Sequence, residues 1–179
     1  ARKEKPRGTL QLPHGVGDLA PVHAAYLQGR GYRLRTLTRL WGGQGIALHS
    51  RLSWRVFIPI VYQGKCVSWT TRSTQDDVQR RYISAEAHQE AIPHKELLYG
   101  EDYVRHGIIV HEGCTDVWRT GPGAVATFGI DYSRAQVLRM AAYPVRAICF
   151  DNQHQAQRRA RRLCDELSVF PGVTENVVL

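Results

Sequence analysis

The second half of the chain alternates short apolar segments with helical patterns. The apolar segments are compact, as is typical of strands in a parallel sheet that is buried on both faces. They are GIIVH (107–111), AVATFG (124–129), VRAICF (145–150) and VTENVVL (173–179). Shorter helical patterns lie between them, and one long helical pattern begins near Gln155. This alternation predicts an open α/β sheet over residues 104–179.

The first half has a different pattern and predicts a small α+β unit over residues 22–103. Two short helices, HAAYLQGRG and RTLTRLWG, are followed by the strand-like segments WRVFIPIVY and KCVSWTTR. The step Gln63-Gly64 between these segments indicates a hairpin turn. Pro59 inside the first segment indicates an edge position or a bulge. Residues 1–21, rich in Lys, Arg, Pro and Gly, predict a basic flexible arm.

The chain is basic, with 24 Lys and Arg against 16 Asp and Glu, a net charge of +8 and a pI near 9.6. Such a charge favours a phosphate-rich partner such as nucleic acid, although general solubility accounts for it equally well. With no apolar run of membrane-spanning length and no signal-peptide pattern, we expect a cytoplasmic protein. Because the chain lacks an initiator Met and ends on an apolar run, we expect a fragment of a longer protein, truncated at the C-terminus.

Acidic residues follow two of the predicted strands. Glu112 and Gly113 come directly after GIIVH, Asp116 lies four residues beyond Glu112, and Asp151 comes directly after VRAICF. In open α/β sheets the functional crevice lies beyond the carboxyl ends of the strands, so these side chains are expected to meet there. Gly113 is expected to permit a sharp turn of the backbone.

Three converging carboxylates would repel one another unless a cation neutralised them. Their hard oxygen ligands suit Mg²⁺ or Mn²⁺, which could position phosphates for nucleotidyl transfer or phosphodiester cleavage. Taken singly, Glu112 could be a salt-bridge partner and Asp151 a helix N-cap. As a set at strand ends, they favour a functional site. His111 and His154 flank the acids, where hydrogen bonding is a commoner role than metal ligation.

The long helix has an apolar stripe and an arginine-rich face. Its arginines lie away from the stripe and are expected to face outward. They are Arg158, Arg159, Arg161 and Arg162. A solvated face is the commoner explanation of such a run, with nucleic-acid contact as the alternative.

The motifs EGCTD after an apolar strand, ATFG after the next strand, and FD before a helix resemble the Toprim domain of primases, topoisomerases and some nucleases. Upstream, YLQGRGY, the paired strand segments, RYIS and HKELLYGEDY resemble the catalytic core of bacterial-type DNA primases in order and spacing. The resemblance extends from about Ala24 to Asp151. It implies an α+β N-terminal subdomain followed by an α/β Toprim domain with a mainly parallel open sheet.

The resemblance also implies a function, namely synthesis of short RNA primers on single-stranded DNA with Mg²⁺ or Mn²⁺. Nucleoside triphosphates would be substrates, and a replicative helicase is a candidate partner. In this family's pattern Glu112, Asp116 and Asp151 are metal-site acids, with Glu112 also catalytic. Lys95 would be a catalytic residue that binds phosphates near the metal. Arg55, Arg72 and Arg81 would line a basic cleft that binds nucleic acid or nucleotide without reading bases.

The sequence departs from the family's pattern at one acid. Where the family has a second acid two residues after the helix-opening Asp151, this chain has Gln153, whose neutral amide offsets no cation charge. A non-catalytic Toprim module that binds nucleic acid through a degenerate metal site is therefore an alternative. A Toprim nuclease is a further alternative that the primase-like first half disfavours.

Overall fold

The structure is a computed structural model that describes residues 8–75 and 78–178 of the chain. The chain divides into two compact units. Unit 1 comprises residues 1–61 and 65–93, and unit 2 comprises residues 62–64 and 94–179. Each unit is described by itself. Within the described ranges, no helix combines the length and the apolar character that crossing a bilayer requires.

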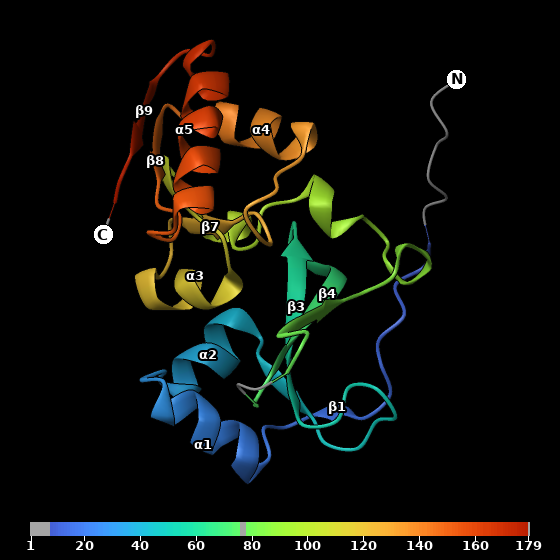
Figure 1. Cartoon of the computed structure of the whole chain (residues 1–179). Coiled ribbons are helices and arrows are strands. Elements are labelled where there is room, and N and C mark those ends of the chain that lie inside the picture. The colour runs from blue at the N-terminus through green and yellow to red at the C-terminus, as the bar shows by residue number, and fades with distance from the viewer. Residues whose placement is uncertain (1–7, 76–77, 179) are drawn as a thin grey trace. The chain divides into compact units, whose positions relative to one another are not determined.

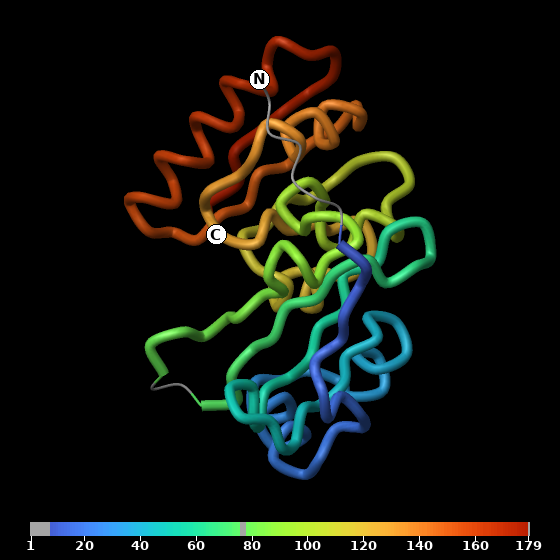
Figure 2. The backbone as a smooth tube through the Cα atoms, turned by 90° about the vertical axis from the view of Figure 1, so that its right-hand side faces the viewer, coloured from blue at the N-terminus to red at the C-terminus, as the bar shows by residue number. Residues whose placement is uncertain are grey.

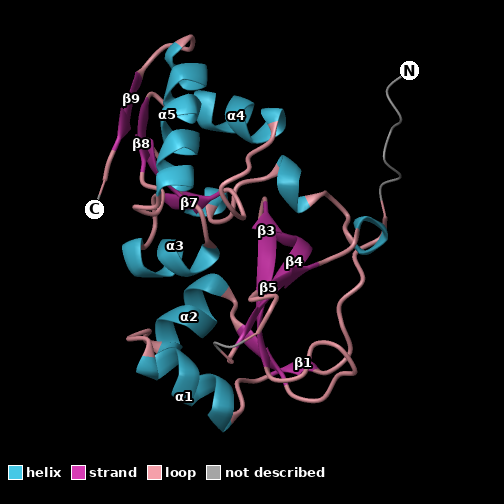
Figure 3. Cartoon of the chain, viewed as in Figure 1, coloured by secondary structure: helices cyan, strands magenta, loops and turns pink. Residues whose placement is uncertain are grey.

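Unit 1 is built on a five-stranded sheet with the strand order β1-β2-β3-β4-β5 (Figure 3). The strands are β1 (Val16–Gly17), β2 (Gln44–Ile46), β3 (Arg55–Tyr62), β4 (Lys65–Ser73) and β5 (Tyr82–Ser84). The pairs β1–β2, β2–β3 and β4–β5 are antiparallel. The two predicted helices are α1 (Pro21–Gly29) and α2 (Leu34–Trp41).

The predicted hairpin between β3 and β4 is confirmed. Gln63 and Gly64 both have positive φ angles, 52° and 74°, as the favoured two-residue hairpin turns require. Pro59 was expected at an edge or a bulge, but β3 is the central strand of the sheet, between β2 and β4. On the β2 side the pairing runs only through Arg55–Phe57, so Pro59 lies beyond the end of that short neighbour. The missing N–H of proline is tolerated beyond the end of a short neighbouring strand.

Residues 8–20 differ from the predicted flexible arm, whose residues 1–7 lie outside the described residues. The Gln11 amide donates to the carbonyl of Gln89, and the Trp69 indole donates to the carbonyl of Gln11. Pro13 is buried, and β1 extends the sheet. These hydrogen bonds hold the segment against the rest of unit 1. They depend on residues distant in sequence, so composition alone could not predict them.

Unit 2 contains a four-stranded sheet in which all three strand pairs are parallel, with the order β7-β6-β8-β9. The strands are β6 (Gly107–His111), β7 (Ala124–Ala126), β8 (Val145–Ile148) and β9 (Val173–Asn176). The helices are α3 (Cys114–Thr120), α4 (Arg134–Ala141) and α5 (His154–Ser168). The expected fold class, an α+β unit followed by an α/β unit with a parallel open sheet, is confirmed.

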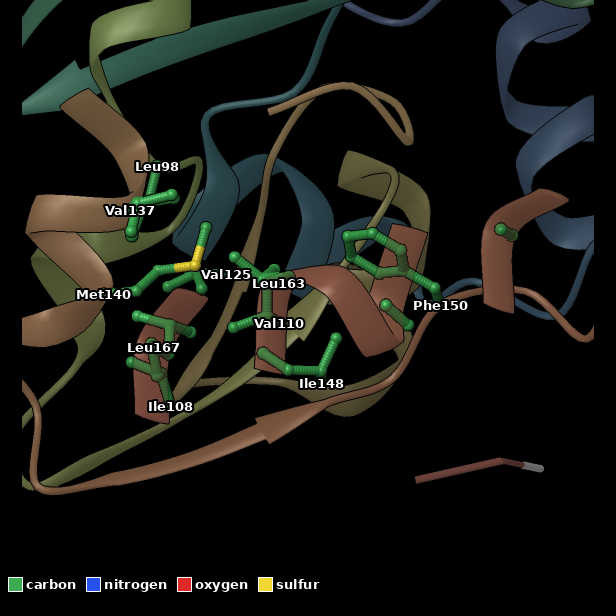
Figure 4. Close-up of a cluster of buried hydrophobic side chains, with 12 residues drawn as sticks. Leu98, Ile108, Val110, Val125, Val137, Met140, Ile148, Phe150, Leu163 and Leu167 are labelled. Atoms are coloured by element: carbon green, nitrogen blue, oxygen red, sulfur yellow. The ribbon is translucent and has the colours of Figure 1, made fainter. Parts of the chain in front are cut away.

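The core of unit 2 lies between one face of its sheet and the helices α4 and α5 (Figure 4). Ile108, Val110 and Ile148 project from the strands toward Met140 of α4 and Leu163 of α5. In Figures 1 and 2, α5 and β9 lie side by side. Because α5 buries its apolar stripe here, the sheet and the start of this helix are held in one rigid arrangement.

The division between the units falls between Pro93 and His94, ten residues before the boundary expected from the sequence at residues 103/104. Two short 3₁₀ helices, η2 (His94–Glu96) and η3 (Glu101–Tyr103), belong to unit 2. Between them, Tyr99 bridges to Ala126 of β7. Because of this contact with the parallel sheet, residues 94–103 belong to unit 2, whereas the sequence analysis assigned them to the first unit.

Candidate active site

The candidate site lies at the carboxyl ends of the parallel strands β6 and β8. Residues 107–110 of β6 pair in register with residues 145–148 of β8, and the Cys149 amide continues the ladder to the Val110 carbonyl at 2.8 Å. The acids that follow these strands therefore start from adjacent positions. Oε1 of Glu112 accepts a hydrogen bond from the backbone N–H of Asp151 at 2.9 Å. The predicted meeting of these two residues is thus seen in the structure.

Asp116 reaches the same edge of the sheet from the first turn of α3. Asp116 and Asp151 both line a pocket of about 320 Å³. The other residues of this pocket are His111, Arg119, Thr120, Cys149, Phe150 and Asn152. Gly113 precedes α3 with φ −121°, a conformation open to any residue. The backbone at this position therefore does not require glycine, contrary to the expectation from the sequence.

The three acids influence one another electrostatically. Burial raises the pKa of Glu112, and the charges of Asp151 and Asp116 raise it further, against the hydrogen bond from the Asp151 amide, which lowers it. The same two aspartates, together with burial, raise the pKa of the Cys149 thiol. A neighbouring negative charge disfavours each further negative charge, so this edge of the sheet would bind a cation more readily than an anion.

The donors of this site fit Mg²⁺ chemically, but they do not form a closed cage. Across residues 8–75 and 78–178, no three His, Cys, Asp or Glu side chains are grouped as a metal site. Mg²⁺ commonly keeps several waters and binds through one or two carboxylates together with substrate phosphates. Asp116 and Asp151, which share the pocket, are the residues suited to such an open site, with Glu112 beside them.

His111 is held by hydrogen bonds at both ring nitrogens. Nδ1 lies 3.1 Å from the Cys149 carbonyl, and Nε2 lies 2.8 Å from the hydroxyl of Thr120. Burial lowers the pKa of His111, against the charges of Asp116 and Asp151 and the carbonyl of Cys149, which raise it. A neutral ring that donates from Nδ1 and accepts at Nε2 satisfies both contacts. His111 thus supports the pocket wall, while His154 is exposed at the start of α5.

Lys95 does not present its ammonium group to a ligand in this structure. Its Nζ donates to the carbonyl oxygens of Thr127, Phe128 and Asp131 at 3.0, 2.9 and 2.8 Å. An ammonium group has three N–H donors, so these bonds account for all of them. Burial lowers the pKa of Lys95, while the nearby Asp131 raises it. In this structure Lys95 therefore holds the loop after β7, and its phosphate-binding role stays a prediction.

The loop that Lys95 holds is connected to Glu112. Phe128 has φ 61°, and the following Gly129 has φ 111°. The amide of Gly129 then donates to the Glu112 carbonyl at 2.7 Å, while the amide of Thr127 donates to the His111 carbonyl at 3.2 Å. A left-handed conformation at a bulky residue such as Phe128 is costly and needs surrounding contacts to maintain it. Lys95 supplies three of these contacts.

Two further residues at this edge were missed by the sequence analysis. Nε2 of Gln157 donates to the carbonyls of Phe150 and Asp151, each at 3.1 Å. Oε1 of Gln157 accepts from Nδ2 of Asn176 at 2.9 Å. The sequence offered one indication, namely that Gln157 directly follows Ala156 of the apolar stripe of α5. A glutamine at the edge of a buried stripe needs specific hydrogen-bond partners for its amide. Gln153, the departure from the family's pattern, is exposed and precedes α5 as its N-cap residue.

The three arginines predicted to bind nucleic acid all belong to unit 1. Arg55 is 7% exposed and donates to Thr71 and to the carbonyls of Arg80 and Arg81. Arg72 is 8% exposed, donates to the hydroxyl of Tyr26, and stacks on the ring of Tyr82 at 5.0 Å. Both guanidinium groups are thus engaged inside unit 1, and their binding of nucleic acid stays a prediction.

Arg81 differs from Arg55 and Arg72, because its side chain is exposed. Its backbone carbonyl accepts from both Arg55 and the amide of Ser73. Of the three arginines, Arg81 has the most exposed side chain.

Comparison with solved structures gives the fold a class. The Aquifex aeolicus primase, in a structure of its zinc-binding and RNA polymerase domains, matches with a TM-score of 0.75 and 16% identity, over 89% of this chain and 50% of that one. The DnaG primase catalytic domain bound to single-stranded DNA matches with a TM-score of 0.65 and 17% identity, over 89% and 65%. The primase fragment of the bacteriophage T7 primase-helicase protein matches with a TM-score of 0.62 and 17% identity, over 99% and 74%.

These similarities show that the chain has a primase-like fold. It spans half the length of the Aquifex aeolicus chain and 65% of the length of the DnaG catalytic domain chain. No family model matches the sequence, and no curated protein was found to match it.

Substitution of Lys95 tests its role in holding the loop. Lys95→Met removes three hydrogen bonds from a charged donor and leaves two part-buried carbonyls and one exposed carbonyl without that partner. We therefore expect a loss of roughly 2–4 kcal/mol in the free energy of unfolding. Urea denaturation measures it. Lys65→Met, at an exposed lysine, is the matched control and is expected to change stability by less than about 0.5 kcal/mol. Equal stability of the two variants would contradict the role assigned to Lys95.

The raised pKa of Glu112 predicts a pH dependence of stability. Because the folded-state pKa lies above the ordinary value of 4.5, this carboxyl contributes stability below pH 4.5 and loses that contribution as pH rises through the folded-state value. Glu112→Gln keeps an oxygen acceptor for the Asp151 amide and does not ionise. We therefore expect it to match the wild type near pH 4 and to exceed it in stability at pH 7, as followed by urea denaturation. A variant less stable than the wild type at pH 7 would show that ionised Glu112 is stabilising.

Proposed function

We propose that this chain is a primase-type nucleotidyltransferase core that synthesises short RNA primers on single-stranded DNA with Mg²⁺. The observation that carries the proposal lies at the carboxyl edge of the parallel sheet of unit 2, within a primase-like fold. Asp116 and Asp151 share a pocket there, and the Glu112 carboxylate bonds the Asp151 amide. Neither part suffices alone, because folds host many functions and acidic groups occur on many surfaces.

Each acidic residue of the site would have its own role. Asp116 and Asp151 would hold Mg²⁺ in the pocket they share, where the ion would supply positive charge to phosphate oxygens. Glu112 is anchored beside them through Oε1, which accepts from the Asp151 amide. Its raised pKa brings this carboxylate closer to the range in which a side chain can accept a proton from an attacking hydroxyl.

The proposed partners are single-stranded DNA and nucleoside triphosphates. The net charge of +8 and the exposed Arg81 support binding of a polyanion. One structural neighbour is a DnaG domain bound to single-stranded DNA, and another is a fragment of a primase-helicase protein. By the same analogy, a replicative helicase is a candidate partner. Because Lys95 is engaged with carbonyls, other cations would have to contact the triphosphate.

A second candidate function is supported by the open geometry of the acids. In the part of the chain that the structure describes, no three potential ligands form a metal group, and Gln153 stands where the family has an acid. A module that binds single-stranded nucleic acid without catalysis would keep the fold and the positive charge with just such a site. This candidate predicts strong, salt-sensitive binding and no primer product.

A primer-synthesis assay tests the proposed activity. The purified chain is incubated with single-stranded DNA templates, labelled ribonucleotides, and Mg²⁺ or Mn²⁺, and products are resolved by length. We expect short RNA from the wild type and a loss of at least about 100-fold for Glu112→Gln. Asp165→Asn, at an exposed acid of α5 that lines neither described pocket, is the matched control and should retain activity.

The same assay separates the alternatives. Absence of product on every template with either metal, from protein that still binds the templates, would contradict the primase proposal and favour the non-catalytic module. Shortening of the template would instead identify a nuclease.

A further inference from the structure

The outer face of α5 carries a compact group of arginines that the acidic site does not use. Gln155, Arg158, Arg159 and Arg162 follow the spacing i, i+3, i+4, i+7, which places them on one face of a helix. Together they line a pocket of about 350 Å³ in unit 2. We refer to these four residues as the arginine groove.

The arginine groove is fixed in place by the opposite face of the same helix. Ala160, Leu163 and Leu167 are fully buried in the core of unit 2, and Ala156 is 2% exposed. In Figures 1 and 2 the helix lies along β9. The arginine side chains therefore project from a rigid base, which lowers the entropic cost of holding them around a ligand.

Internal acids neutralise the arginine groove only in part. Arg159 pairs with Asp131 at 2.8 Å, and Arg162 pairs with Glu166 at 3.0 Å. Each of these contacts uses one of the five N–H donors of a guanidinium group. Arg158 has no ion pair with an acid of the described residues. It also lies one helical turn from Arg162, which carries the same charge. Like charges at this spacing destabilise a helix, so a bound anion would relieve a cost that the fold otherwise carries.

The position of the arginine groove relates it to the acidic pocket. Asn152 lines the acidic pocket and Gln155 lines the arginine groove, only three residues further along the chain. From Gln155 to Arg162 the groove extends about 10 Å along the helix axis. This length exceeds that of one phosphate group and suits successive phosphates of an extended strand.

We propose that the arginine groove binds backbone phosphates of a single-stranded nucleic acid, on the strand that passes the acidic pocket. The choice of ligand rests on the proposed function, whereas the site rests on the geometry of α5. Guanidinium groups bind phosphate oxygens through paired N–H donors and, without contacts to base edges, recognise no particular sequence. The arginine groove thus adds to unit 2 a phosphate-binding surface separate from Arg81 of unit 1.

The test is the salt dependence of oligonucleotide binding. Fluorescence anisotropy follows a labelled oligothymidylate bound by the purified chain between about 50 and 200 mM salt. We expect Arg158→Ala to weaken binding several-fold and to reduce the slope of log K against log salt by about 0.7, the value for one phosphate contact on a single strand. Arg158→Ala together with Arg162→Ala should reduce it by about twice as much.

Arg161→Ala is the matched control, because Arg161 is also exposed on the same helix but does not line the groove. We expect its slope to equal that of the wild type. If Arg158→Ala and Arg161→Ala reduce the slope equally, the effect is general electrostatic attraction and the arginine groove is refuted. If the wild type binds no oligonucleotide, the proposed function fails together with the groove. If the wild type binds and makes primers while Arg158→Ala behaves like the wild type, only the groove fails.

Discussion

The parallel pairing of β6 with β8 is the constraint on which the candidate site depends. It places the residues after His111 and after Ile148 side by side, so that the amide of Asp151 can bond the carboxylate of Glu112. A hydrogen bond from a backbone amide to a charged oxygen fixes the direction of that carboxylate. Asp116, in the first turn of α3, adds a further negative charge at this end of the sheet, which favours binding of a cation.

Hydrogen bonds to the backbone behind the acids give this edge its shape. Lys95 holds the carbonyls of a loop whose Gly129 bonds the Glu112 backbone, and Gln157 holds the backbone after β8. Sites that perform chemistry need such support, because the direct ligands must be held within a fraction of an ångström. Lys95 therefore contributes to the acidic site through the backbone.

Much of the fold and part of the site could be predicted from the sequence. Compact apolar runs separated by helical patterns predicted the parallel sheet, and Gln63-Gly64 predicted the hairpin, because both depend on local pattern. The adjacency of Glu112 and Asp151 followed from a general property of parallel sheets. What could not be predicted depends on contacts distant in sequence. Arg55 and Arg72 become internal donors because their partners arrive from other segments, and Lys95 finds carbonyls more than thirty residues away.

The central claim is that the acids at the ends of β6 and β8 bind a divalent cation. Titration with Mn²⁺, followed by the loss of its free paramagnetic resonance signal and competed with Mg²⁺, measures this directly. We expect one saturable class of sites in the wild type, displaced by Mg²⁺ and lost in Asp151→Asn with the fold retained. Identical Mn²⁺ binding by the wild type and Asp151→Asn would contradict it. So would absence of binding in a chain that still binds single-stranded DNA.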